Sequence, residues 1–156
     1  MRANRPGDTG PMDALMGLFW LLAGILGGGD EDPECLVLGG LDAVRAQVFV
    51  SGDEARLRDV YVDERAARAD TDVLRSYRER GLLLAGMVLV RESCRVTDRS
   101  QKGVTLDVVD HLGPTSVRTA DGRRRGLPRD GSTRRAVVLE RTDDGWRVGA
   151  VRRALA

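Results

Sequence analysis

Residues 88–112, VLVRESCRVTDRSQKGVTLDVVDHL, decide the fold because their apolar side chains recur at every second position. A period of two is the pattern of a β-strand with one buried face. The first predicted face consists of Val88, Val90, Glu92, Cys94 and Val96, and the second of Val104, Leu106, Val108, Asp110 and Leu112. The polar residues 98–103 between them predict a turn, so the two strands form an antiparallel hairpin.

Toward the C-terminus, the same alternation continues in shorter runs at 116–120 and 133–142, and in a last strand from Trp146. The sequences Asp-Gly at 121–122 and Asp-Asp-Gly at 143–145 predict tight turns between these strands. The second half of the chain is therefore predicted to be an antiparallel meander.

Toward the N-terminus, the apolar period lengthens to about 3.6, which predicts helices. The predicted helices are one over 40–50, a second that opens at the Ser51 capping box, and, after a polar linker at 63–70, a third from Asp70 or Thr71 to Gly81. Helices followed by antiparallel strands predict an α+β domain over 35–156, with the three N-terminal helices packed on one face of a sheet.

Residues 1–34, an apolar segment with an acidic linker, precede this domain and bear on its location. Residues 14–29 hold no charged side chain, and sixteen residues are fewer than the ~20 that a transmembrane helix needs. Arg2 and Arg5 come before this stretch and four acids at 30–34 follow it, which favours a cytoplasmic N-terminus. Three interpretations stay open: a short anchor or uncleaved signal, a soluble helix that docks on protein, and a cleaved signal. We expect a membrane-anchored or exported protein, with a cytoplasmic one as the alternative.

The overall charge is close to neutral, because 25 Lys and Arg stand against 24 Asp and Glu and the net charge is +1. This balance excludes a histone-like chain, whose whole surface is cationic. One His and two Cys exclude zinc fingers and iron–sulfur cages, and 4% aromatic residues disfavour a stacking platform for nucleic acid. The composition predicts no metal, no cofactor and no nucleic-acid partner.

The basic excess is confined to residues 111–156, which hold eleven arginines against five acids. Its centre is a predicted basic patch of Arg123, Arg124, Arg125, Arg129, Arg134 and Arg135. One interpretation is an anion-binding edge for phosphate, nucleic acid or lipid head groups. The other is a solvated hairpin face, which we favour because acids interrupt the cluster and no aromatic residue does.

Several stretches carry a resemblance to a known family, among them residues 41–46 (LDAVRA), 57–62 (LRDVYV), 109–112 (VDHL), 138–141 (VLER) and 144–148 (DGWRV). Over roughly residues 38–152 the chain resembles the nuclear transport factor 2-like superfamily, also called cystatin-like or SnoaL-like. Within it, the chain is similar to actinobacterial members that follow an N-terminal membrane segment. The resemblance implies a cone in which three helices wrap against one strongly curved antiparallel sheet around a pocket. Enzymatic members use acids in that pocket, whereas many others are non-catalytic, among them membrane-tethered domains of secretion and transport machines.

The side chains predicted to line such a pocket are Tyr61, Glu92, Asp110 and Trp146. Glu92 and Asp110 lie on otherwise apolar strand faces, and pairing of the hairpin brings them close together. Desolvation and mutual repulsion raise the pKa of such a carboxylate pair, which then suits proton abstraction next to a carbonyl, as in isomerase-like relatives. The alternative is that each acid lies at the mouth of the cone beside an arginine, such as Arg118 or Arg141.

No ordered catalytic signature accompanies these residues. The single histidine, His111, directly follows Asp110, and adjacent strand residues point to opposite faces. We therefore favour a non-enzymatic binding or assembly module whose partner is a protein or a second copy, with membrane contact through 14–29 and a small apolar ligand as further options. The alternatives are a small isomerase-like enzyme and a soluble cytoplasmic protein that docks through its apolar N-terminus.

Cys35 and Cys94 are 59 positions apart and have two interpretations. Outside the cytoplasm they could form one disulfide between the first helix and the first long strand. The favoured interpretation is two small buried apolar residues.

Overall fold

The structure is a computed structural model that describes residues 31–153. The apolar stretch at 14–29, with its three interpretations, lies outside the described residues. Within the described part of the chain, no helix combines the length and the apolar character needed to cross a membrane.

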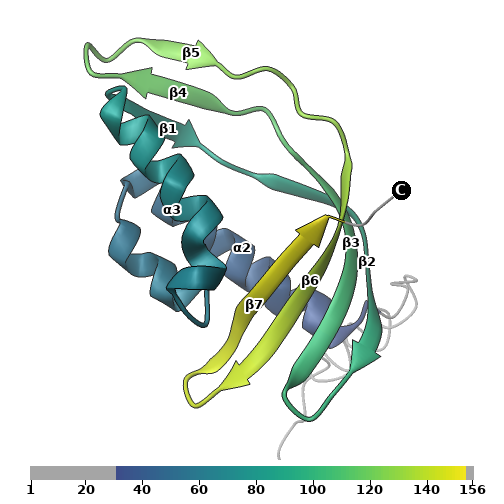
Figure 1. The fold of residues 1–156 in the computed structure, drawn as a ribbon. Helices are drawn as coiled ribbons and strands as arrows, with labels where there is room; N and C mark the ends of the chain where they lie inside the picture. Colours follow the sequence, from purple (N-terminus) through teal and green to yellow (C-terminus); the bar gives the residue numbers. More distant parts are fainter. Residues whose placement is uncertain (1–30, 154–156) are drawn as a thin grey trace, which may run out of the picture. The chain divides into compact units, whose positions relative to one another are not determined.

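Within residues 31–153, two α-helices and one 3-10 helix form the helical layer: α2 (Pro33–Ser51), η1 (Glu54–Asp59) and α3 (Glu64–Glu79) (Figure 1). The helix predicted at 40–50 begins much earlier, because Pro33 takes a position in its first turn, where a missing N–H is harmless. Ser51 ends α2 instead of opening a helix, and Gly52 closes it with a left-handed φ of 72°. The predicted linker at 63–70 is wrong, because the Asp63 carboxylate caps α3 by accepting from the Ala66 N–H at 2.8 Å.

Seven antiparallel strands follow: β1 (Leu82–Gly86), β2 (Leu89–Arg99), β3 (Gly103–Leu112), β4 (Ser116–Thr119), β5 (Arg124–Gly126), β6 (Thr133–Thr142) and β7 (Gly145–Arg153). They form two sheets with strand orders β1-β4-β5 and β2-β3-β6-β7 (Figure 1). The chain is α+β, but the predicted architecture of three helices on one curved sheet, a cone or cystatin-like roll, is wrong.

The split between the two sheets lies where the β3–β4 connection interrupts the ladder. Gly113 donates its N–H to the Val88 carbonyl at 2.8 Å, and Pro114, which has no N–H to donate, follows it. On the other side, the loop 127–132 separates β5 from β6, so no strand pair continues from one sheet into the other.

A β-bulge at Glu92 reverses the faces of β2. Arg91 pairs with Asp110 and Ser93 pairs with Val109, so Glu92 is the extra residue. The prediction that Val88, Val90 and Glu92 share the inner face with Cys94 and Val96 is therefore wrong. Before the bulge the inner face is that of Leu89 and Arg91, and Val88 and Val90 are 61% and 39% exposed. The face predicted for β3 is confirmed, since Val104, Leu106, Val108 and Asp110 are buried.

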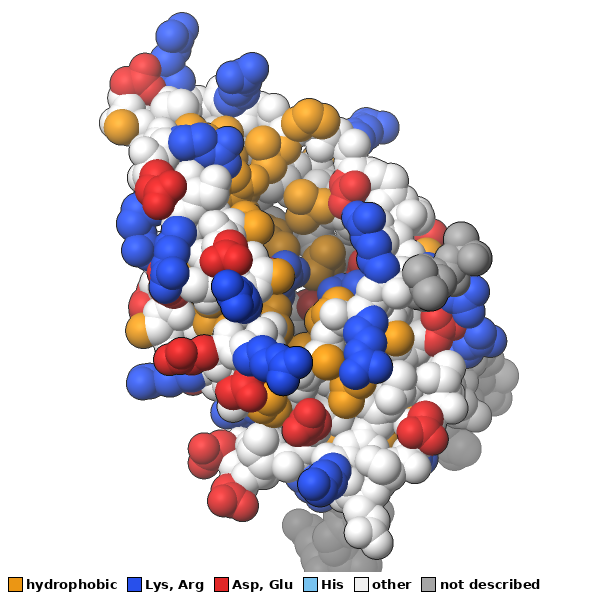
Figure 2. All heavy atoms as spheres, in the orientation of Figure 1, with side chains coloured by type: hydrophobic (Ala, Val, Ile, Leu, Met, Phe, Trp, Pro, Cys, Tyr) orange, Lys and Arg blue, Asp and Glu red, His pale blue; other side chains and the backbone are white. Residues whose placement is uncertain are grey.

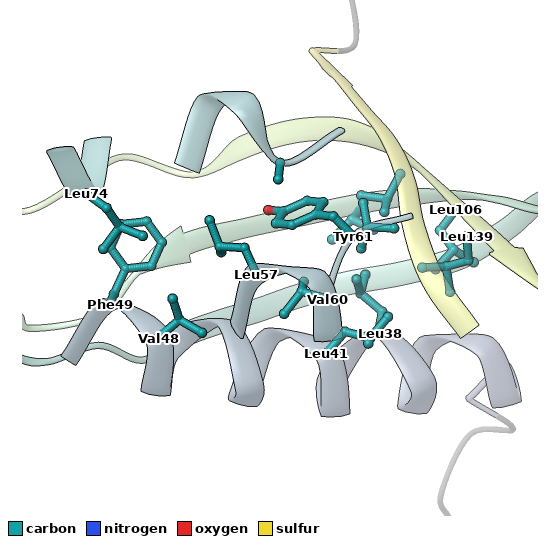
Figure 3. Close-up of a cluster of buried hydrophobic side chains, with 14 of the residues drawn as sticks. Leu38, Leu41, Val48, Phe49, Leu57, Val60, Tyr61, Leu74, Leu106 and Leu139 are labelled. Atoms are coloured by element: carbon teal, nitrogen blue, oxygen red, sulfur yellow. The ribbon is translucent and has the colours of Figure 1, made fainter. Parts of the chain in front are cut away.

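The core lies between the helices and the inner faces of the sheets (Figure 3). Leu38 and Val48 of α2 are fully buried, as are Leu106 of β3 and Leu139 of β6. Residues 60–62 run parallel beside the edge of β7, where Val148 donates its N–H to the Val60 carbonyl at 2.8 Å. This pairing covers one edge of the larger sheet and fixes the position of Tyr61.

Cys35 and Cys94 form a disulfide with a Cα–Cα distance of 6.0 Å. The favoured prediction of two unpaired buried cysteines is wrong, because Cys94 on the inner face of β2 lies directly beside Cys35 in the first turn of α2. The disulfide joins the start of the helical layer to the larger sheet.

Candidate functional site

The four predicted pocket residues do not gather at one site. Tyr61 and Asp110 are buried, but Glu92 lies on the outer face of β2. There its carboxylate accepts from the Ser132 hydroxyl and lies 2.9 Å from His111 Nδ1. These two hydrogen bonds, that of Ser132 first, lower the pKa of Glu92. The predicted Glu92–Asp110 pair does not form, because the bulge turns Glu92 outward.

Trp146 lies near the turn that joins β6 to β7, half-buried against the core. The Arg141 guanidinium stacks on its ring, 4.8 Å from the ring centroid. The stacked guanidinium covers the aromatic ring at this end of the sheet. Trp146 borders none of the larger cavities of residues 31–153.

Asp110 instead belongs to a buried ion network, the most polar part of the interior. The network consists of Asp42 and Arg45 of α2, Asp70 of α3, Arg91 of β2, Asp110 of β3, Arg135 of β6 and the hydroxyl of Tyr61. Three aspartates stand against three arginines, so the network is neutral when all six groups are charged. It joins α2 and α3 to the three neighbouring strands β2, β3 and β6.

Within the network, each carboxylate accepts from a guanidinium. Asp70 accepts from Arg45 Nε and, at 2.7 Å, from Arg45 Nη2, and it also accepts from the Tyr61 hydroxyl at 2.6 Å. Asp110 accepts from Arg135 Nε at 3.0 Å and from the Nη2 of the same side chain.

The third carboxylate, Asp42, lies between the other two pairs. It accepts from Arg91 Nη2 at 3.0 Å and lies 4.0 Å from Arg135 Nη2. A charge buried in the interior is stable only with such partners.

Burial and pairing act in opposite directions on these groups. Burial raises the pKa of Asp42, and the attraction of Arg135, Arg45 and Arg91 offsets this only in part. Burial also raises the pKa of the Tyr61 hydroxyl, which therefore stays protonated and donates to Asp70. Burial lowers the pKa of Arg45, but the Asp70 carboxylate more than offsets it and the net shift is upward.

An apolar groove opens on the outer side of the network, between α2 and the β1–β2 junction. We call it the α2 groove; its volume is about 800 Å³. Its walls are mostly uncharged: Gly39, Ala43, Ala46, Gln47, Val50 and Ser51 of α2, and residues 85–89 of the junction. Its floor consists of Asp42, Arg91 and Asp110. Arg91 Nε is buried there and has no hydrogen-bond partner among the described residues.

The outward face of α2 next to this groove carries no charge. Leu36, Gly40, Ala43, Gln47 and Val50 recur at spacings of three and four and are exposed, Leu36 to 63%. A surface helix of a soluble protein ordinarily presents charged residues there. The neighbouring α3 does so, with Arg65, Arg68, Asp72 and Arg75 exposed. The two helices therefore present different chemistry to solvent.

A second cavity, the α3 cleft, lies on the opposite side of the network, between α3 and the end of β7. Its volume is about 890 Å³, and Arg45, Tyr61, Asp70 and Arg135 line it. Figure 2 shows a hollow beside α3 with hydrophobic side chains along its walls and charged ones at its rim. The exposed side chains of Arg65, Arg68 and Asp72 also line the α3 cleft, so it is a charged cavity, unlike the apolar α2 groove.

The predicted basic patch is divided by the fold. Arg123, Arg124 and Arg125 are exposed at the β4–β5 hairpin, and Arg129 is exposed in the following loop. Arg134 pairs with Asp107 through two hydrogen bonds of 2.7 and 2.8 Å, and Arg135 belongs to the ion network. The reason is alternation along β6, which sends neighbouring side chains to opposite faces.

Sequence reasoning missed Asp42, Arg45, Asp70 and Arg91 as members of the interior. Asp42 and Arg45 are three positions apart in one helix, and this spacing was the only signal that both lie on one face. Arg91 was placed on the outer face because the bulge one residue later has no clear sequence signature.

No protein-family model matches the chain, and no curated protein matches it in sequence. Among solved structures, the intermembrane space region of the chloroplast protein ARC6 is similar, with a TM-score of 0.58 and 12% sequence identity. The similarity covers 82% of this chain and 100% of that chain. At this identity it concerns the fold alone.

Proposed function

We propose that this protein is a non-enzymatic protein-binding module, and that the α2 groove holds an extended apolar segment of its partner. The observation that carries the proposal is the groove itself. It is an open apolar cavity beside a helix whose outward face is uncharged along its whole length. Contiguous exposed apolar surface of this kind marks interaction sites in soluble domains.

The chemistry of the groove favours an extended segment over a helical one. A peptide in extended form has free backbone N–H and C=O groups, which can pair with an exposed strand edge. A helix uses its own carbonyls internally. The strands β1 and β2 are both edge strands that meet at the junction lining the groove, so they are suited to pairing with an added strand.

The enzymatic alternative has less support. It needed a free carboxylate pair, but Glu92 lies outside and Asp42, Asp70 and Asp110 each contact a guanidinium. A carboxylate already held by an arginine is a weaker proton acceptor than a free one at the same depth. We therefore propose a structural role for the ion network: it holds the helices on the sheet and forms the floor of the α2 groove.

We also propose that the domain works outside the cytoplasm, either exported or membrane-anchored. The Cys35–Cys94 disulfide supports this location, because structural disulfides persist in oxidising compartments and are rare in the cytosol. Membership of the nuclear transport factor 2-like superfamily is proposed on the sequence resemblance alone.

The experiment measures binding of short peptides to the full-length protein by fluorescence anisotropy. The probes are fluorescein-labelled eight-residue peptides in which apolar residues alternate with serine, together with a matched set in which glutamate replaces the apolar residues. We expect the apolar set to contain binders and the acidic set to contain none. Val88→Asp should weaken the binding of each binder by about tenfold or more, because a carboxylate at the groove loses hydration when the peptide covers it.

The matched control is Val73→Asp, the same substitution at a valine of α3 that is 43% exposed and outside the groove. The affinity of this variant for each binder should stay within about twofold of that of the unsubstituted protein, as expected for an ordinary surface substitution. Equal binding of both peptide sets, equal losses in both variants, or no binder at all would refute the proposal.

A further inference from the structure

The outer face of the smaller sheet carries a row of one apolar and two basic side chains. Leu83 of β1 pairs in register with Arg118 of β4, and Arg118 pairs with Arg124 of β5. The adjacent row consists of Leu84, Val117 and Arg125, of which Leu84 and Val117 are buried, so the row with Arg118 and Arg124 lies on the outer face.

Two arginines directly opposite each other are unfavourable in an isolated sheet. Like charges at paired positions of an antiparallel ladder repel each other and destabilise it. Neither Arg118 nor Arg124 has an acidic partner within salt-bridge distance in residues 31–153. An external anion would remove this repulsion.

The rest of the hairpin adds to the positive potential. Arg123, Arg125 and Arg129 are exposed and are likewise without an acidic partner in the described range. Asp121 is engaged in the turn, where it accepts from the Thr119 hydroxyl and, at 3.3 Å, from the Arg123 N–H. Figure 2 shows basic side chains around this end of the molecule, at the top of the view.

We infer that the β4–β5 hairpin binds the surface of an anionic lipid bilayer, through a site separate from the α2 groove. Leu83 is 38% exposed in the same row, and an apolar side chain among arginines fits the boundary between head groups and acyl chains. The hairpin has no aromatic residue on which a nucleic-acid base could stack, and the disulfide supports a compartment outside the cytoplasm. Nucleic acid, which competes for surfaces of this charge, is therefore disfavoured and becomes an outcome of the test.

The experiment measures sedimentation of the full-length protein with vesicles of phosphatidylcholine, with and without an equal part of phosphatidylglycerol. We expect tighter binding to the anionic vesicles, weakened when salt is raised from about 0.1 to about 0.5 M. Each arginine at an anionic surface contributes about fivefold in affinity, so Arg118→Gln with Arg124→Gln should weaken that binding about twenty-five-fold. Binding to neutral vesicles should not change.

The control with the same net charge is Arg65→Gln with Arg68→Gln, which removes two exposed arginines from α3 and should leave the preference for anionic vesicles intact. Equal binding to both vesicle types, or equal losses in the two double variants, would overturn the inference. So would a DNA duplex that binds with the same dependence on Arg118 and Arg124.

A further variant separates binding from folding. Arg124→Glu places a carboxylate opposite Arg118, so the unfolding midpoint should hold or rise while binding to anionic vesicles is lost. Loss of binding that occurs only together with a lowered midpoint would contradict a direct role of the hairpin. The peptide-binding test of the α2 groove does not depend on either result.

Discussion

Reduction of the Cys35–Cys94 disulfide should remove a large part of the stability of the domain. The two cysteines are 59 positions apart in sequence. Closing a loop of that length removes roughly 14 cal/mol/K of entropy from the unfolded chain, which is about 4 kcal/mol at 25 °C. Domains of this size are stable by about 5–15 kcal/mol, so the loss is a substantial fraction of the total. The corresponding fall in Tm is about 10–20 °C.

The assay is thermal unfolding followed by circular dichroism, with and without a reductant. The unsubstituted protein should lose about 10–20 °C on reduction. The variant Cys35→Ala with Cys94→Ala should unfold at the lower temperature in both conditions, since it has no bond to reduce. A Tm that reductant does not change, together with two free thiols by mass spectrometry, would show that the bond does not form. The proposal of an extracytoplasmic location would then lose its support.

Other consequences of the structure can be measured in the same way. Asp70→Asn should lower the free energy of unfolding, measured by urea denaturation, by about 3–5 kcal/mol, because it leaves its arginine partner buried without a counter-charge. Tyr61→Phe removes one hydrogen bond and should lower it by about 1 kcal/mol. Equal losses in the two variants would contradict this account. Burial raises the pKa of Asp42 in the folded state above its value in the unfolded state. Between these two pKa values the folded state binds more protons than the unfolded state. The contribution of Asp42 to stability therefore falls as the pH rises from the lower pKa to the higher one. Asp42→Asn should therefore be most destabilising relative to the unsubstituted protein at low pH, and less so toward neutral pH; the opposite trend in urea midpoints would refute the assignment. Gly103→Ala should destabilise the protein by about 1–3 kcal/mol, because the added Cβ would lie 2.0 Å from the backbone carbonyl oxygen of Leu139. Gly149→Ala should cost less, because its Cβ would meet only the movable carboxylate of Glu140, at 2.1 Å.

The sequence predicted best those features that depend on neighbouring residues. The inner face of β3 follows from alternation at Val104, Leu106 and Val108, and the turns at 121–122 and 143–145 follow from glycines that adopt positive φ. Both signals are local, so they need no knowledge of the partner strand.

Features set by distant contacts were predicted poorly. The bulge at Glu92 depends on how β2 pairs with β3, and it alone reassigns Arg91 to the interior and exposes Val90. The division into two sheets depends on breaks at separate positions in the chain. The Gly113-Pro114 break and the loop that begins at Gly126 were visible in the sequence, but their combined effect on the strand pairing was not.

The candidate site illustrates the same limit. Asp42, Arg91 and Asp110 come from α2, β2 and β3 and meet only because the fold brings them under one groove. Asp42 and Arg91 look like ordinary surface charges when the sequence is considered alone, and only Asp110 was predicted to lie on an inner face. The uncharged outward face of α2 was present in the sequence, but the apolar period there was used only to predict a helix over 40–50.

The central claim, that an extended apolar segment occupies the α2 groove, is tested most directly by the position of a bound peptide. A peptide binder from the apolar set can carry a nitroxide at its centre, and the backbone amide signals of the full-length protein are then recorded by NMR. We expect the nitroxide to broaden the signals of residues 39–50 and 85–91 and to leave those of α3, residues 64–79, unchanged. Broadening centred on α3, or spread evenly over residues 31–153, would contradict the proposed function.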